Sequence, residues 1–258
     1  MIKNKRVDII ISTQAIGGAE RASGLLYKNL ETKLRHLRLL TLRSSANYEF
    51  ESNFIQIPRK RRLAGLLPSR IDFLLDIRKV LKRNKTEVVI TFMSGVTIMV
   101  FLSLIFMNVK IIACERSDPF SSTPSRSRLA ITKFIYKLVN VVIVQTDRVK
   151  DRLHSEWKLQ NMTVIGNMIP LRSSAYFGIN KCVTNIVSVS RLVGTKNNHL
   201  LIYSLRNILN AKCRLTIYGH GPEKKSLEAL TNKLDLKNYV EIISGETCIN
   251  TMLVDADI

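Results

Sequence analysis

Short apolar runs alternate with helix-like segments along nearly the whole chain, and this alternation constrains the fold most strongly. Val7–Thr13, Val88–Phe92 and Val141–Gln145 are compact runs rich in β-branched residues, typical of fully buried strands. Segments whose apolar residues have helical spacing separate such runs. Strands that alternate with helices in this way predict parallel βαβ units whose sheet is covered on both faces.

The predicted elements form two consecutive series. The first has strands at Val7–Thr13, Leu37–Leu42, Phe54–Ile57, Val88–Phe92, Val109–Cys114, Val141–Gln145 and Met162–Ile165, and helices at Glu20–Leu30, Ser69–Asn84, Val96–Met107, Leu129–Leu138 and Asp147–Glu156. The second has strands at Asn185–Ser190, Arg214–Tyr218 and Tyr239–Ile243, and helices at Asn198–Leu209, Pro222–Leu234 and Ile249–Ala256.

The two series predict two domains of an α/β protein. Residues 1–170 form a Rossmann-like N-terminal domain, the polar segment 171–184 is a linker, and residues 185–258 form a C-terminal domain. The chain stops at Ile258, where a further strand is expected, and three strands leave an open sheet edge. We therefore expect the second domain to be incomplete.

The chain is strongly basic, with 40 Lys and Arg against 20 Asp and Glu. Up to Pro170 there are 29 basic and 13 acidic residues, and Ile55–Lys85 alone holds 10 basic residues and two acidic ones. Such a charge attracts polyanions: nucleic acid, anionic lipid headgroups or phosphorylated substrates. The alternative is a basic surface that is merely solvated.

A basic amphipathic helix is predicted within this stretch. Ser69 and Asp72 form a capping box, and an apolar stripe runs from Phe73 to Leu81. The basic residues on and before the helix are Arg59, Lys60, Arg61, Arg62, Arg78, Lys79, Lys82 and Arg83. This arrangement fits an anionic membrane surface, and it equally fits a helix packed on a core with a wet basic face.

Several protein classes are disfavoured. The four cysteines are far apart and lack the spacing of a zinc site or a disulfide scaffold, which favours a reducing cytosol. The N-terminus lacks the long apolar region and cleavage site of a signal peptide. Val88–Val109 is 22 residues without a charge, so an integral membrane protein is one alternative. A β-α-β unit better explains Thr91, Ser94-Gly95 and Asn108, which lie where its elements would meet.

Three glycine or cation motifs follow predicted strands. Gly17 and Gly18 come between the first strand and its helix, where backbone N–H groups can meet an anion. Arg191 and Lys196 follow the first strand of the second series, and two cations there suit a diphosphate leaving group. Gly219 and Gly221 come next, in a turn where a nucleotide could approach the backbone.

Two further motifs carry acidic residues. Glu115 and Arg116, in Cys114–Pro119, are either part of a site or a structural ion pair. Asp255 and Asp257 imitate a D-x-D metal signature, but they close a helix, and we expect no metal.

In this order the motifs resemble the family-four retaining glycosyltransferases of the GT-B fold. The segment GGAER resembles the glycine loop of that family, and ERSDP resembles the "ERNDP"-like segment of its polysaccharide-assembly members. VIGNMIP is similar to the element that closes the first domain, SRLVGTKN to "GRL…K", and YGHGPEKKSL to "GDGPER..L". The resemblance spans nearly the whole chain and implies two Rossmann-like domains that face a cleft.

The resemblance also implies roles for residues. Arg191 and Lys196 would bind the donor diphosphate, and Gly17 and Gly18 would line the cleft. Gly219, Gly221, Gly245 and Glu246 would lie on the nucleotide side. Glu115 or its neighbours would face the acceptor, with Glu115 as the catalytic candidate, although this region lacks the histidine of many members. The family's E-x7-E pair would lie beyond Ile258.

The function implied is transfer of a hexosyl residue, with retention, from a nucleotide-sugar to a polyprenyl-diphosphate-linked glycan. That is a step of bacterial surface polysaccharide or lipopolysaccharide synthesis on the cytoplasmic face of the cell membrane. No cofactor is expected beyond the nucleotide-sugar substrate, and loss of E-x7-E could leave this chain inactive. A nucleic-acid-binding protein is the other alternative, but the single Trp and scattered aromatic residues provide no stacking platform.

Overall fold

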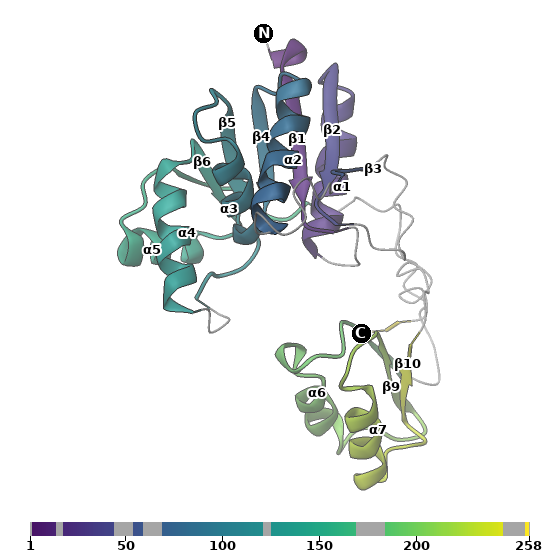
Figure 1. Ribbon diagram of the computed structural model, residues 1–258. Helices are drawn as coiled ribbons and strands as arrows, with labels where there is room; N and C mark the ends of the chain where they lie inside the picture. The colour runs from purple at the N-terminus through teal and green to yellow at the C-terminus, as the bar shows by residue number, and fades with distance from the viewer. Residues whose placement is uncertain are drawn as a thin grey trace. The chain divides into compact units, whose positions relative to one another are not determined.

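The computed structural model describes residues 2–13, 18–43, 54–58, 69–120, 125–168, 184–244 and 256–257. The chain forms two compact units, Met1–Pro170 and Leu171–Ile258 (Figure 1). Each unit has a parallel sheet of its own, which confirms the predicted α/β class.

The N-terminal unit contains one seven-stranded sheet. Its strands are β1 (Arg6–Ile11), β2 (His36–Thr41), β3 (Phe54–Gln56), β4 (Val88–Phe92), β5 (Lys110–Cys114), β6 (Val141–Val144) and β7 (Met162–Val164). They lie in the order β3-β2-β1-β4-β5-β6-β7, and every neighbouring pair is parallel. This order reverses between β1 and β4, as it does at the centre of a doubly wound fold.

Helices cover this sheet from both sides. They are the 3-10 turn η1 (Ile2–Asn4), α1 (Gly18–Glu31), α2 (Ser69–Arg83), α3 (Ser94–Ser103), α4 (Arg126–Leu138) and α5 (Asp147–Trp157). Apolar residues of α2 to α5 pack on one face of the sheet, in a core with Ile10, Val89 and Val142. Residues of α1 pack on the other face, against Ile9 and Leu39 (Figure 1).

The C-terminal unit is smaller. It contains β8 (Thr184–Val189), η2 (Gly194–Lys196), α6 (Asn198–Leu205), β9 (Cys213–Tyr218), α7 (Lys224–Lys233) and β10 (Val240–Ile243). The strands lie in the order β10-β9-β8 and are all parallel. Asp257 bonds to the main chain of Asn185 through both its own N–H and its carboxylate, so the described C-terminal residues run along β8.

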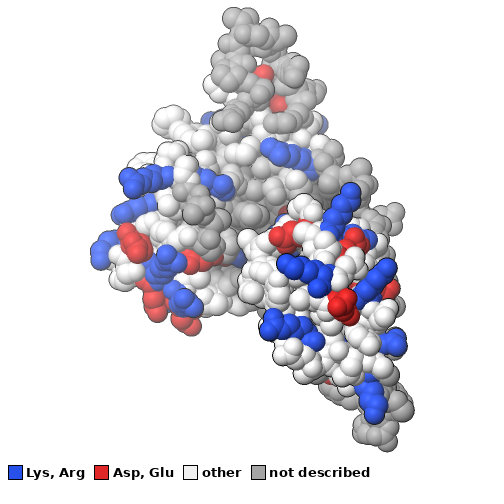
Figure 2. Space-filling model, turned by 90° about the horizontal axis from the view of Figure 1, so that it is seen from below, with Lys and Arg blue, Asp and Glu red and all other residues white. Residues whose placement is uncertain are grey.

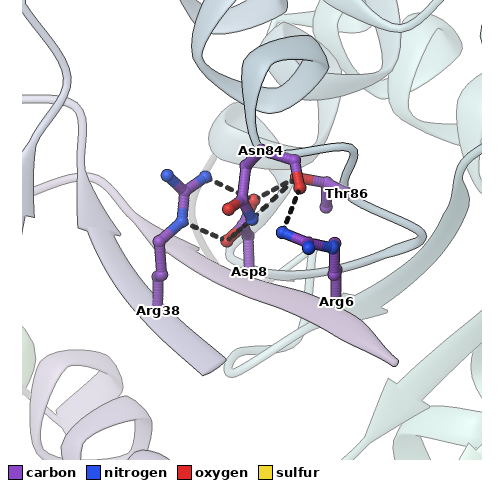
Figure 3. Close-up of polar contacts among 5 residues, drawn as sticks. All are labelled: Arg6, Asp8, Arg38, Asn84 and Thr86. Carbon is purple, nitrogen blue, oxygen red and sulfur yellow. Dashed lines mark hydrogen bonds and ion pairs between the residues drawn. The ribbon is translucent and has the colours of Figure 1, made fainter. Parts of the chain in front are cut away.

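A buried carboxylate ties the centre of the larger sheet together (Figure 3). Asp8 of β1 is fully buried, and Arg38 of β2 donates to its two oxygens at 2.8 Å each. Thr86 and Asn84, between α2 and β4, also donate to Asp8. Arg6 donates in turn to the carbonyl oxygen of Asn84 at 3.2 Å. The cluster therefore joins β1, β2 and the α2–β4 corner, and every charge in it has a partner.

The uncharged stretch Val88–Val109 divides into β4, α3 and a turn that leads into β5. Helix α3 has ten residues, about 15 Å in length, which is half of a bilayer core. Within the described residues, no helix is both long and apolar enough to cross a membrane. The β-α-β interpretation of this stretch is therefore correct for the structure described.

Helix α2 packs on the core, so its apolar stripe is not a membrane-facing surface. Phe73, Ile77 and Leu81 are buried against the sheet. Lys79, Lys82 and Arg83 are exposed, whereas Arg78 donates to the carbonyl oxygens of Ser103 and Ile105 at 3.0 and 2.7 Å. Of the two interpretations of this helix, the core-packed one with a wet basic face is correct. The placement of Arg78 on a membrane surface stays a prediction, and part of its guanidinium is engaged at the C-terminal end of α3.

We expect Asp8→Ala to lower the free energy of unfolding by about 3 kcal/mol, because it leaves the partly buried Arg38 guanidinium without a counter-charge. Urea unfolding followed by circular dichroism measures the loss. The double variant Asp8→Ala/Arg38→Met should recover part of it, because the unpaired charge is then gone. A loss below about 1 kcal/mol in the single variant would contradict a tightly coupled pair.

Candidate functional site

Because the strands are parallel, the loops after them gather at one edge of each sheet. In the N-terminal unit, the β1–α1 and β4–α3 loops flank the point where the strand order reverses. Gly17 lies outside the described residues. Gly18 is the first residue of α1, and a Cβ placed on it would meet nothing within 4 Å. Packing does not require a glycine at position 18, so the space there is open to a ligand.

Met93 joins β4 to α3 in an unusual backbone conformation. Its φ of 73° lies in the left-handed region, which side chains other than glycine rarely adopt. Its N–H donates to the carbonyl oxygen of Cys114 at 2.9 Å, and its own carbonyl oxygen accepts from Val96 and Thr97. The β4–α3 junction is therefore held rigidly beside the end of β5.

Glu115 follows β5 and is buried inside the unit. Tyr136 of α4 donates to its Oε2 at 2.6 Å, and the N–H groups of Arg116 and Ser117 donate to Oε1 at 3.0 and 3.3 Å. Burial raises the pKa of this carboxyl above its ordinary value, although the hydrogen bonds act in the opposite direction. Both oxygens are occupied by the protein itself. This geometry favours Glu115 as the residue that shapes the loop rather than as a catalytic group.

Arg116 does not pair with Glu115, so the motif is not an ion pair. Its Nη2 donates to Oδ1 of Asn167, which follows β7, and Gln145, which follows β6, donates to the same oxygen at 2.8 Å. The guanidinium lies 5.9 Å from the centroid of the Phe92 ring. Burial lowers the pKa of the guanidinium, and no carboxylate pairs with it in the described part of the chain. Arg116 is thus a half-buried cation at the carboxyl edge of β5.

The rest of this motif anchors the loop. Asp118 accepts the N–H of Phe120 at 2.9 Å and pairs with Arg152 of α5 at 2.6 Å. The Arg152 guanidinium lies over the Phe120 ring at 4.5 Å, and that ring packs edge-on against Trp157. Glu115 and Asp118 therefore both hold the loop in place, and Arg116 is the residue between them that reaches the sheet edge.

In the C-terminal unit, Arg191 and Lys196 lie in the loop that follows β8. Both side chains are exposed, and neither forms an ion pair with any carboxylate among the described residues. The loop has a rigid base: Ser190 donates to the buried Asn198 side chain at 3.1 Å, and Lys196 N–H donates to Val193 at 2.9 Å. Two cations without counter-charges at the carboxyl edge of a parallel sheet can accept an anion.

Gly219 and Gly221 follow β9 and pack directly against this loop. A Cβ on Gly219 would lie 1.8 Å from the carbonyl oxygen of Ser190, and one on Gly221 would lie 2.1 Å from that of Leu192. Leu192 N–H also donates to His220 at 2.8 Å. The need for glycine is thus explained by contact between the two loops, and a nucleotide is not required to account for it. The nucleotide role of these glycines stays a prediction.

The remaining predicted residues, Arg59, Lys60, Arg61, Arg62, Gly245 and Glu246, lie outside the described residues. Ser244, just before Gly245, donates to the carbonyl oxygen of Gly219 at 3.1 Å, so the described segment 184–244 ends beside the Gly219 turn. Sequence reasoning missed Gln145 and Asn167. Their signals were position and motif, since Gln145 ends a predicted strand and Asn167 lies in the VIGNMIP element.

Two family models match the chain. One, described as Glycosyltransferase Family 4, matches residues 16–173, and the other, Glycosyl transferases group 1, matches residues 174–258. Together they follow the two units of the structure.

Two curated relatives are similar in sequence. Uncharacterized glycosyltransferase MJ1059 of Methanocaldococcus jannaschii is 28% identical over 193 residues, which are 65% of this chain and 47% of that protein. Amylovoran biosynthesis glycosyltransferase AmsD of Erwinia amylovora is 23% identical over 236 residues, 88% of this chain and 65% of that protein. This chain therefore spans about half to two thirds of the length of these relatives.

Solved structures share the fold. Anabaena Alr3699/HepE in complex with UDP and glucose gives a TM-score of 0.80 at 12% identity, over 98% of this chain and 73% of that one. Sucrose-phosphate synthase from Thermosynechococcus elongatus gives 0.78 at 14% identity, over 97% of this chain and 72% of that one. These neighbours confirm the GT-B fold class predicted from the sequence.

We expect Gly219→Ala to lower the free energy of unfolding by about 3 kcal/mol, because the new methyl group meets a backbone oxygen that cannot move alone. Chemical unfolding measures the change. Gly166→Ala is the matched control, since a Cβ there meets nothing within 4 Å, and its effect should stay within about 0.5 kcal/mol. Equal stability of the two variants would show that the loops are not in contact.

The buried Glu115 predicts a pH-dependent stability. A carboxyl whose pKa is raised on folding stabilises the protein below its ordinary value of 4.5, and this contribution is lost as the pH rises through the raised pKa. Glu115→Gln cannot ionise, so wild type should lose stability relative to this variant as the pH rises above 4.5. Urea unfolding of both proteins across this range tests the prediction, and parallel curves would refute it.

Proposed function

Because the chain belongs to glycosyltransferase family 4, we propose that it transfers a hexosyl residue, with retention, from a nucleotide-sugar to a lipid-linked glycan. The observation that carries the proposal is the pair of exposed cations, Arg191 and Lys196, which have no carboxylate partner among the described residues and follow the first strand of the C-terminal sheet. Both curated relatives are named glycosyltransferases, and their support for this assignment comes from family membership alone.

In this proposal the donor diphosphate is the leaving group. The bond from the anomeric carbon to the diphosphate lengthens, positive charge develops on the sugar ring, and negative charge develops on the departing phosphate oxygens. The planar guanidinium of Arg191 and the ammonium of Lys196 stabilise that negative charge as it forms. The two cations supply this stabilisation by themselves, so we propose that no metal ion takes part.

The donor is proposed to be a nucleotide diphosphate sugar because solved neighbours bind such ligands. Anabaena Alr3699/HepE has been solved in complex with UDP and with UDP-glucose. Gly219, Gly221, Gly245 and Glu246 remain the proposed nucleotide-side residues. The contact of the Gly219 turn with the Ser190–Leu192 segment supports this, because it places the turn next to Arg191.

On the acceptor side we propose Arg116 in place of Glu115. Glu115 is buried and fully hydrogen-bonded, whereas Arg116 is a half-buried cation without a carboxylate partner in the described part of the chain. A guanidinium held by Asn167 can bind a phosphate group of a polyprenyl-diphosphate-linked acceptor. Gly17 and Gly18 would leave the neighbouring backbone open to ligand.

The location proposed is the cytoplasmic face of the cell membrane, and the process is surface polysaccharide synthesis. The relative from Erwinia amylovora is an amylovoran biosynthesis glycosyltransferase, which supports the process. The net charge of +20 supports attraction to anionic lipid headgroups. On the face drawn in Figure 2, Lys and Arg side chains lie with acidic side chains among them.

The diphosphate role of Arg191 and Lys196 is tested by calorimetric titration with UDP. Arg191→Ala and Lys196→Ala should each weaken UDP binding by about tenfold or more, because each removes a charge-assisted contact. Uridine binding should not change, since uridine lacks the diphosphate.

Lys212→Ala is the matched control for this titration. It removes an exposed cation from the opposite edge of the same sheet, just before β9, and should leave UDP binding unchanged. UDP binding that is equal in wild type and in the Arg191→Ala/Lys196→Ala double variant would overturn the assigned role.

A further inference from the structure

Helix α4 carries an exposed apolar stripe beside its buried face. The buried face places Ile135 and Tyr136 in the core of the N-terminal unit. Next to it, Ile131, Phe134 and Leu138 are 49%, 63% and 53% exposed, at the i, i+3 and i+7 spacing of a single helical stripe. Large apolar side chains gathered in this way on a surface mark a contact site for a partner. No described residue covers this outer stripe.

The charges on α4 are all of one sign. The helix sequence Arg126–Leu138 contains Arg126, Arg128, Lys133 and Lys137 and no acidic residue. Arg126, Arg128 and Lys137 are exposed, whereas Lys133 reaches the carbonyl oxygen of Glu156. An exposed apolar stripe on a helix whose own charges are all cations matches the boundary between the hydrocarbon and the headgroups of an anionic bilayer.

A second apolar group is presented by the turn between α3 and β5. Phe106 is 100% exposed, and its φ of 64° lies in the left-handed region. Met107 N–H donates to Leu104 at 2.8 Å, so Phe106 occupies a turn position that favours glycine. A phenylalanine here contributes no burial to the fold, and its left-handed backbone conformation is strained. Folding does not account for this residue.

Both groups belong to one helical layer. Helix α3 packs between α2 and α4 on the same face of the sheet. Arg78 of α2 donates to the carbonyl oxygens of Ser103 and Ile105, and the exposed Lys79, Lys82 and Arg83 follow on the same helix. The layer thus carries both the apolar groups and additional cations.

We propose that the outer side of α4 and the Phe106 turn form the surface by which this protein docks on an anionic lipid bilayer. The biological setting of this inference rests on the proposed function. The inference adds the surface that would bring the enzyme to a lipid-linked acceptor. Phe134, Leu138 and Phe106 enter the headgroup region, and the cations of α4 and α2 face the lipid phosphates. Membrane docking is assigned to the α4 stripe, because the apolar stripe of α2 is in the core.

The experiment is vesicle co-sedimentation of the full chain with no sugar donor or acceptor present. Phosphatidylcholine vesicles are compared with vesicles that also contain phosphatidylglycerol. Wild type should bind the anionic vesicles and bind the neutral ones far more weakly. Phe134→Ser/Leu138→Ser and, separately, Phe106→Gly should each raise the lipid concentration at half-binding by about tenfold or more.

A control variant and the stability of Phe106→Gly make the result specific. Leu200→Ser/Ile208→Ser removes two side chains of the C-terminal unit that are each 51% exposed, and this variant should bind vesicles as wild type does. Phe106→Gly also relieves the left-handed backbone strain, so it should be at least as stable as wild type. Its vesicle binding therefore tests the proposal even if the α4 variant fails to fold.

Three outcomes would overturn the proposal. The first is that wild type binds no anionic vesicles, and the second is that Phe106→Gly binds them as well as wild type does. The third is that light scattering shows a dimer that depends on α4 while no vesicle binding occurs, in which case a second copy of the chain is the partner. Titration with UDP separates this inference from the proposed function, because the docking variants should retain UDP binding and Arg191→Ala should retain vesicle binding.

Discussion

Parallel pairing of the strands determines where all the functional candidates lie. Every described strand in both sheets runs parallel to its neighbours, so the chain must cross back over the sheet after each one. Each crossover begins at the carboxyl edge, and the residues that follow β5, β6 and β7 are brought together there although they are distant in sequence. Arg116, Gln145 and Asn167 meet for this reason alone. The same constraint sets Arg191 beside the Gly219 turn in the smaller sheet.

Buried carboxylates support this arrangement from within. Asp8 holds β1, β2 and the α2–β4 corner near the amino edge of the sheet, and Glu115 holds the loop that follows β5 at the opposite edge. A carboxylate that is buried and fully hydrogen-bonded is a poor catalyst but an effective support, because its partners cannot be moved without exposing an unpaired charge. The acidic residue of the ERSDP motif therefore shapes the loop after β5, and the arginine beside it is half-buried without a carboxylate partner among the described residues.

Charge and apolar exposure carry different information about surfaces. The basic character of the chain is visible in its composition, but one of its cations, Arg78, serves as an internal partner of α3. The apolar stripe of α2 has a helical pattern that also suits a membrane, yet it lies in the core. Helix α4 has a similar composition but leaves Ile131, Phe134 and Leu138 exposed beside its buried face. Whether an apolar stripe is buried or exposed therefore depends on what each helix packs against.

The amino-acid sequence by itself determined the type and order of the described elements, the division near Pro170 and the family, because these follow from local periodicity and from short motifs; the predicted helix Ile249–Ala256 lies almost wholly outside the described residues. It also identified the cations after β8, since they come directly after a strong strand pattern. Only the tertiary structure decided that Glu115 is internal, that Gly219 and Gly221 are required by the neighbouring loop, and that Phe134 and Phe106 face outward. These properties depend on contacts between residues that are far apart in the chain, and a local pattern does not specify which side of a helix its neighbours cover.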